Sequence, residues 1–119
     1  MYSIKVESHF SAAHNLREYK GKCEELHGHN WRVEAAVEQE NLGAGGMVMD
    51  FVLFKEELKK VMETLDHKYV NNIPYFQKVN PTSENIAKYV YDNLKAAITG
   101  LKSVTVWESE RSSATYEES

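Results

Sequence analysis

The sequence predicts an α+β fold in which two helices cover the apolar face of an antiparallel sheet, in the order β-β-α-α-β-β. Two observations support it: apolar residues alternate with polar ones near both ends of the chain, and they recur at helical spacing in between. The chain has 119 residues, too few for two independent cores, so we expect one domain over residues 1–119. No internal repeat and no linker interrupts it.

The first two strands are predicted at residues 2–14 and 27–38. Residues of one parity in the first strand are apolar: Tyr2, Ile4, Val6, Phe10 and Ala12. In the second strand the same parity holds His27, His29, Trp31, Val33, Ala35 and Val37. This period of two indicates strands that are buried on one face. A polar loop over residues 15–25 joins them, and we expect them to pair antiparallel.

Two helices are expected in the middle of the chain. After a glycine-rich turn at residues 41–46, Asp50 can cap a helix whose apolar positions are Phe51, Phe54, Leu58, Val61 and Leu65. Residues 69–80 contain Pro74 and three asparagines, and Pro81 follows directly, so we expect a loop here. Thr82 or Asn80 then caps a second helix with Ile86, Val90, Leu94 and Ile98 on its buried side and Gly100 at its end.

Two short strands close the predicted sheet, at residues 104–108 and 112–117. The first strand carries few of the charged or proline residues that usually protect a sheet edge. We therefore expect this edge to pair with other copies of the chain in a homo-oligomer.

The amino-acid composition narrows the classes of partner that we expect this chain to bind. With 14 Lys plus Arg against 18 Asp plus Glu, the net charge is −4, and the basic surface of a nucleic-acid binder is missing. No apolar run approaches the ~20 residues that span a bilayer, and residues 1–5 lack the apolar core of a secretory signal. One cysteine cannot form an intrachain disulfide. We expect a cytoplasmic protein without nucleic-acid or membrane partners.

Three histidines form a candidate metal site. His27 and His29 lie two residues apart on a strand, so both imidazoles point to the same face. His14 ends the first strand on its apolar parity, whereas His9 has the polar parity and is expected at the surface. Three neutral imidazoles with an open fourth position are typical of catalytic zinc, although iron or nickel would also accept them.

Four further residues are candidates with two interpretations each. Cys23 is either an inert thiol or, beside a cation, a base or nucleophile. Asp66 and His67 follow the first helix, either as a solvated helix end or as a carboxylate that orients a proton-relaying imidazole. Glu108 shares the parity of Val104 and should face the apolar layer, where it must pair with an internal donor or a ligand.

Several short motifs occur together and in order along nearly the whole chain: His14, Cys23-x-x-x-His27-Gly28-His29, residues 46–51, 65–67 and 81–85, and Trp107-Glu108. In this combination the chain resembles the 6-pyruvoyl-tetrahydropterin synthase family, and in its compact length it is most similar to the bacterial 6-carboxytetrahydropterin synthase branch. The resemblance implies the tunnelling fold, whose subunits join edge to edge into barrels, as trimers or hexamers with active sites between subunits.

The resemblance also implies roles for the site residues. His14, His27 and His29 would be the zinc ligands, and Cys23 the thiol that abstracts a proton, assisted by Asp66 and His67 of a neighbouring subunit. Glu108 would anchor the pterin ring, with Thr82 and Ser83 helping to hold it. The implied substrate is 7,8-dihydroneopterin triphosphate, converted with release of triphosphate and acetaldehyde for the synthesis of queuosine and other deazapurines.

Alternatives remain at this point. Glu24 and Glu25 follow Cys23, and some relatives use a glutamate near this loop to form 6-hydroxymethyl-dihydropterin for folate synthesis. Formation of 6-pyruvoyl-tetrahydropterin is a second possibility within the family. Outside it, a three-histidine zinc site could serve a hydrolase, and a non-catalytic module that binds pterin or metal is the simplest reading.

Overall fold

The structure is a computed structural model that describes residues 1–18 and 24–118. It confirms the predicted α+β class. The sheet is formed by β1 (Tyr2–His14), β2 (His27–Gln39), β3 (Leu101–Trp107) and β4 (Ser113–Glu117). The helices are α1 (Phe51–Glu63), α2 (Pro74–Lys78) and α3 (Ser83–Lys95), with short 3-10 turns η1 (Ala44–Gly46) and η2 (Val70–Asn72). Among the described residues, no helix is long and apolar enough to cross a membrane.

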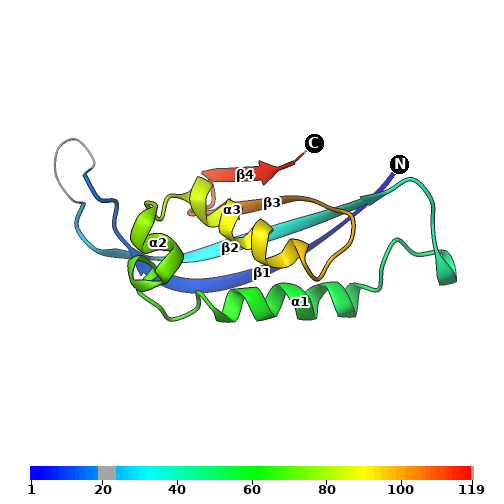
Figure 1. Ribbon diagram of the computed structural model, residues 1–119, viewed down its shortest axis with the longest axis horizontal. Helices are drawn as coiled ribbons and strands as arrows, with labels where there is room; N and C mark the ends of the chain where they lie inside the picture. The colour runs from blue at the N-terminus through cyan, green and yellow to red at the C-terminus, as the bar shows by residue number, and fades with distance from the viewer. Residues whose placement is uncertain (19–23, 119) are drawn as a thin grey trace.

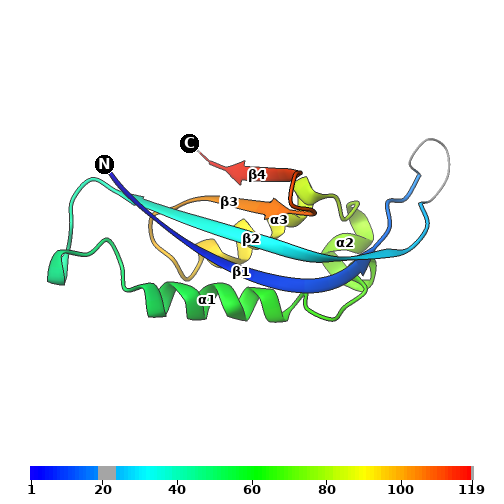
Figure 2. The same cartoon turned by 180° about the vertical axis from the view of Figure 1, so that it is seen from behind.

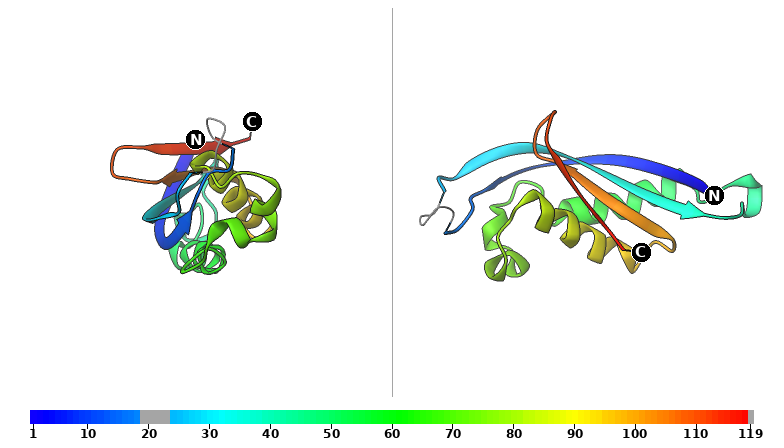
Figure 3. Two further views of the ribbon diagram at one scale, coloured as in Figure 1. Left: turned by 90° about the vertical axis from the view of Figure 1, so that its left-hand side faces the viewer. Right: turned by 90° about the horizontal axis from the view of Figure 1, so that it is seen from above.

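All four strands are antiparallel, and their order in the sheet follows the sequence, β1-β2-β3-β4. Helix α1 packs on β1, and α3 packs on β3 and β4. Figure 1 and the view from behind in Figure 2 show that the helices lie on one face, and Figure 3 shows the two layers from the end and from above. β1 and β2 are the longest strands, and together they run along most of the molecule (Figure 1).

The core lies between the two layers and follows the predicted parity. Val6, Phe10 and Ala12 on β1 are buried, and so are Trp31, Val33 and Ala35 on β2. Phe54 and Leu58 on α1, and Ile86, Val90 and Leu94 on α3, close the core from the other side. His9 is exposed on the opposite face of the sheet, as predicted.

The structure contains both predicted helix caps, but it does not bury Phe51 as predicted. The Asp50 carboxylate accepts from Val52 N–H at 2.8 Å. The Thr82 hydroxyl, rather than Asn80, caps α3 and accepts from Asn85 N–H at 3.1 Å. The expectation that Phe51 is buried is wrong: it opens α1 beside a pocket that Tyr2 and Ile4 also line, and it is 49% exposed.

The loop predicted at residues 69–80 holds two short helical pieces, η2 and α2. Pro74 stands at the first position of α2, where its missing N–H costs nothing. The buried side chains of Val70 and Phe76 fasten the two pieces to the core. Strand β3 also starts earlier than predicted, at Leu101, directly after Gly100 makes the turn at φ +84°.

Candidate metal centre and active site

The three histidines meet at one end of the β1–β2 ladder. His14 lies directly opposite His27, and His29 lies opposite Ala12. All three side chains therefore project from the same face of the sheet. The His14 ring centroid lies 4.6 Å from that of His27 and 5.3 Å from that of His29, and the His27 and His29 centroids are 4.8 Å apart.

Backbone carbonyls orient two of these rings. His14 Nδ1 donates to the carbonyl of Pro81 at 2.7 Å, and His27 Nδ1 donates to the carbonyl of Glu25 at 3.0 Å. A neutral imidazole that donates through Nδ1 carries its lone pair on Nε2, so both rings present Nε2 as a ligand atom. Among the described residues, Nε2 of His14 and of His29 are buried without a hydrogen-bond partner, although a carboxylate oxygen of Glu108 lies 3.2 Å from the His29 atom. Such atoms are costly unless a ligand supplies the missing partner.

These orphaned nitrogens fit a zinc ion. The ligand atoms of His14, His27, His29 and Glu108 all lie within 4.8 Å of one another. Burial lowers the pKa of His14, against the opposing effect of its bond to Pro81, and so favours the neutral imidazole that a metal requires. Three imidazoles and one carboxylate form a donor set that zinc accepts. The cluster is therefore consistent with a zinc site.

Trp31 forms the floor under the cluster. Its ring lies edge-to-face with His14 at 4.8 Å and with His29 at 5.3 Å, and it stacks on Phe10 at 5.5 Å. The indole N–H donates to the carbonyl of Ala12 at 3.3 Å, which fixes the ring. The sequence pattern predicted that Trp31 is buried but gave no sign of this supporting role.

A pocket of about 230 Å³ opens beside the histidines. It is lined by His14, Leu16, Glu24, His27, Thr82, Ser83, Glu84 and Glu108. Thr82 and Ser83 come from the start of α3, so the structure brings these two predicted substrate-binding residues, together with Glu108, to the pocket beside the metal cluster. Leu16 and Glu84 were not anticipated as lining residues.

Glu108 faces this pocket rather than the apolar layer. The prediction that it is buried in that layer is wrong, because β3 ends at Trp107 and a turn closed by Glu108 N–H and the Ser112 carbonyl follows. Its side chain is 36% exposed, with Oε1 at 3.2 Å from His29 Nε2. Ser83 Oγ donates to Oε2 at 3.2 Å. The carboxylate therefore joins the metal cluster to the start of α3.

Asp66 and His67 do not line this pocket and lie against the outer edge of β1. Asp66 Oδ1 accepts from Ser11 N–H at 2.8 Å, and Oδ2 lies 3.1 Å from His67 Nδ1. The bond from Ser11 is the main cause that lowers the pKa of Asp66. The Asp66 carboxylate therefore contacts the His67 imidazole, as one of the two sequence-based interpretations of this pair requires. His67 has φ +58°, and its side chain is 83% exposed.

Cys23 lies outside the described residues, so the predicted thiol has no structural account. The two glutamates after it differ. Glu24 lines the pocket, with Oε1 at 3.7 Å from His27 Nδ1, and the same oxygen accepts from Leu16 N–H at 3.1 Å. Glu25 is exposed and contributes its backbone carbonyl.

Comparison with known proteins agrees with this geometry. Residues 3–119 match the family model described as 6-pyruvoyl tetrahydropterin synthase. The chain is 39% identical to 6-carboxy-5,6,7,8-tetrahydropterin synthase of Synechocystis, over 98% of this chain and 93% of that protein. It is 36% identical to dihydroneopterin monophosphate aldolase of Pyrococcus furiosus, over 88% of each chain.

The fold has a close counterpart among solved structures. The 6-pyruvoyl tetrahydropterin synthase of Caenorhabditis elegans superposes with a TM-score of 0.87 at 28% identity, over 99% of this chain and 96% of that one. Sequence match, fold and histidine cluster thus agree along nearly the whole chain. The chain belongs to the 6-pyruvoyl tetrahydropterin synthase family and is a lyase of the pterin-synthase type.

Proposed function

We propose that this enzyme converts 7,8-dihydroneopterin triphosphate and water into 6-carboxy-5,6,7,8-tetrahydropterin, acetaldehyde and triphosphate. The similarity to the Synechocystis 6-carboxytetrahydropterin synthase over almost the full length of both chains carries this choice of product. The reaction would serve queuosine and other deazapurine synthesis in the cytoplasm.

His14, His27 and His29 would hold the zinc ion through their Nε2 atoms. Bound zinc supplies Lewis-acid chemistry: it stabilises the charge that develops on a substrate hydroxyl or carbonyl oxygen. The two orphaned, buried Nε2 atoms are the observation that supports this assignment. The Pro81 and Glu25 carbonyls hold two of the rings in the required tautomer.

Glu108 would anchor the pterin ring. Its two carboxylate oxygens can accept two parallel hydrogen bonds from the guanidine-like edge of a pterin. The Ser83 hydroxyl contacts Oε2, which limits the rotation of the carboxylate, and Thr82 lies beside it at the start of α3. Anchored there, the ring would extend its side chain toward the histidines.

Cys23 would take and return the proton at the substrate side chain. Asp66 and His67 would assist from a neighbouring subunit of a homo-oligomer, a trimer or hexamer, because within one chain this pair lies outside the pocket. The exposure of the His67 side chain supports a role toward a second copy. The imidazole would relay the proton, and Asp66 would orient it through the 3.1 Å contact.

The position of Glu24 supports a second candidate reaction, cleavage of the substrate side chain. Glu24 lies in the pocket beside His27, where a carboxylate could serve as the base that cleaves the side chain to 6-hydroxymethyl-dihydropterin. The Pyrococcus aldolase is a relative whose name describes cleavage of a dihydroneopterin. Glu25 is exposed and is not among the residues that line the pocket, so it is a matched control for Glu24.

Identification of the product by mass spectrometry decides between these reactions. Wild-type protein incubated with 7,8-dihydroneopterin triphosphate should yield the 6-carboxy product, and Cys23→Ala should lower its turnover by ~10² or more. Glu24→Gln keeps an acceptor for Leu16 N–H and should act like Glu25→Gln. A wild type that forms 6-hydroxymethyl-dihydropterin, retained in Cys23→Ala and lost in Glu24→Gln, would instead establish the glutamate-based reaction.

A further inference from the structure

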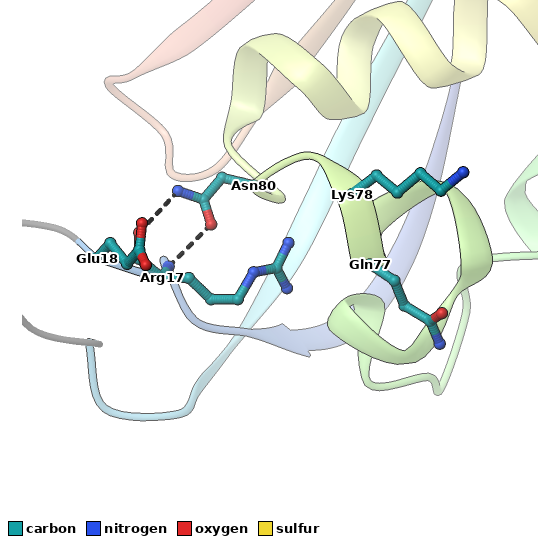
Figure 4. Close-up of a pocket in the computed structure, with 5 residues that line it drawn as sticks. All are labelled: Arg17, Glu18, Gln77, Lys78 and Asn80. Carbon is teal, nitrogen blue, oxygen red and sulfur yellow. Dashed lines mark hydrogen bonds between the residues drawn. The ribbon is translucent and has the colours of Figure 1, made fainter.

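Two asparagine side chains hold the short segment Asn15–Arg17, which directly follows the metal-ligand candidate His14. Asn71 binds Asn15: its Oδ1 accepts from Asn15 N–H at 3.1 Å, and its Nδ2 donates to the Asn15 carbonyl at 2.8 Å. Asn80 binds Arg17 in the same way, at 2.8 and 2.9 Å (Figure 4). We call these two pairs the amide clamps.

A carboxamide offers one carbonyl and one N–H in the plane of a peptide group. Each amide clamp therefore satisfies both backbone groups of one residue, as a neighbouring strand would. Asn15 and Arg17 are two residues apart and are bound in succession, so side-chain amides hold the segment that follows the end of β1. Asn71 is 6% exposed, so water has little access to its amide and cannot readily replace these hydrogen bonds.

The Asn80 clamp is linked to the metal cluster through Pro81. The Asn80 carbonyl accepts from Asn85 Nδ2 at 2.9 Å and from Thr82 N–H at 2.9 Å, which fixes residue 80 to the start of α3. The next carbonyl, of Pro81, accepts from His14 Nδ1. Chain and hydrogen bonds thus form a closed ring from His14 through Arg17, Asn80 and Pro81 back to the His14 imidazole.

The Asn71 clamp is linked to the second ligand strand. Asn15 Nδ2 donates to the Glu24 carbonyl at 3.0 Å, and Glu24 N–H donates to the Leu16 carbonyl at 2.8 Å. Glu24 precedes Glu25, whose carbonyl orients His27. The Asn71 clamp therefore fixes the point where the chain leaves β1 and returns toward β2.

The side chain of Arg17 also serves this arrangement. It lines a second pocket of about 350 Å³ with Glu18, Gln77, Lys78 and Asn80 (Figure 4). Its guanidinium donates to the carbonyls of Phe76 and Val79 at the end of α2. These donors are used within the chain, so we interpret Arg17 as a further tie between the segment and α2.

We propose that Asn80 and Asn71 are positioning residues of the metal centre: Asn80 orients His14 through the Pro81 carbonyl, and Asn71 holds the base from which His14 and His27 approach each other. The proposal rests on the zinc site of the proposed function. It concerns how the ligands are held and predicts an effect on metal affinity and ring tautomer.

Zinc affinity, measured by competition with a chromogenic chelator, tests the proposal. Asn80→Asp replaces the amide donor by a carboxylate oxygen that faces the Arg17 carbonyl, and Asn71→Asp does the same at Asn15. Each should weaken zinc binding ~10–100-fold, the usual cost of removing a group that holds a metal ligand. Asn80→Ala, smaller and uncharged, should act in the same direction if Asn80→Asp does not fold.

Two controls separate positioning from general destabilisation. Asn72→Asp adds the same charge at the exposed neighbour of Asn71 and should keep wild-type affinity. Ile98→Val trims the core near the end of α3 and should lower the thermal midpoint without changing zinc affinity. Wild-type zinc affinity in folded Asn80→Asp and Asn71→Asp would overturn the proposal.

The tautomer of His14 supplies a readout that needs no metal. In zinc-free wild type, ¹⁵N NMR of the imidazole should show the neutral form protonated at Nδ1, because the Pro81 carbonyl holds that proton. Asn80→Asp should show a mixture of tautomers. If the wild type has this tautomer but binds no zinc, the zinc site of the proposed function fails, while the orientation of His14 through the Pro81 carbonyl stands. An unchanged tautomer in Asn80→Asp excludes the route through Pro81.

Discussion

The middle of the β1–β2 ladder and its histidine end follow one alternating pattern but have different chemistry. In the middle, Phe10 and Trp31 stack across the strands, and Phe54 of α1 closes over the same core. At the end, the cross-strand pair is His14 and His27, and two buried imidazole nitrogens lack hydrogen-bond partners within the part of the chain that the structure describes. The fold tolerates this cost of ~1–3 kcal/mol per group where a ligand can remove it. Stability and function are therefore carried by adjacent parts of one ladder, and four variants test this separation.

The largest effect is expected in the middle of the ladder. Phe54→Ala empties a fully buried site and should lower the free energy of unfolding by ~3–5 kcal/mol in urea titrations. Zinc affinity of the folded protein should stay at the wild-type value, because the ligands sit at the other part of the ladder. A parallel loss of zinc affinity would show that the two parts are not separate.

At the histidine end the order of effects should reverse. His27→Ala should weaken zinc binding by more than the ~10²-fold upper cost of losing a group that only holds a ligand. The unfolding free energy of the metal-free protein should change by less than ~1 kcal/mol, since the His27 side chain is 35% exposed. Full zinc content in the purified variant would contradict the ligand assignment.

Glu108→Gln tests whether pterin binding and zinc binding depend on different residues of the site. One acceptor oxygen becomes a donor, so a donor edge of the pterin meets a donor, and pterin affinity should weaken by about 2 kcal/mol. Zinc affinity should change little if the carboxylate binds the pterin. Calorimetric titration with a pterin and with zinc checks both, and the reverse result would make Glu108 a metal ligand.

The smallest effect concerns pH at the edge of β1. The native pKa of Asp66 is lowered, mainly by the hydrogen bond from Ser11 N–H, so the carboxylate adds stability above its unfolded pKa, near the ordinary value of 3.8. That contribution should fade as the pH falls through the lower native pKa. Asp66→Asn should remove this part of the acid dependence in urea unfolding of the zinc-free protein. An identical pH profile in wild type and variant would refute it.

Local signals predicted much of the fold and the centre of the site. The parity of His27 and His29, and the cap at Thr82, depend on residues a few positions apart, which the sequence displays directly. The parity of Phe10 and Trp31 likewise predicted which side chains enter the core.

Other features depend on contacts that no local pattern encodes. Helix α2 has five residues, too few to display a helical period, and its burial depends on Phe76. The exposure of Glu108 is set by the turn that ends β3, because parity indicates a face but not where a strand stops. The amide clamps join residues 56 and 63 positions apart, and isolated asparagines in a loop give no sign of such partners.

The sequential order of the strands has a consequence for folding kinetics. β1 and β2 form a local hairpin, whereas β3 must pair with β2 across an intervening stretch that contains both long helices. Pairings of high contact order are slow because chain entropy is lost before the contacts form. His14, His27 and His29 all belong to the hairpin, while Glu108 arrives only with β3. We therefore expect the three histidines to come together before Pro81 and Glu108 join them, and metal captured by the hairpin would favour the native strand register.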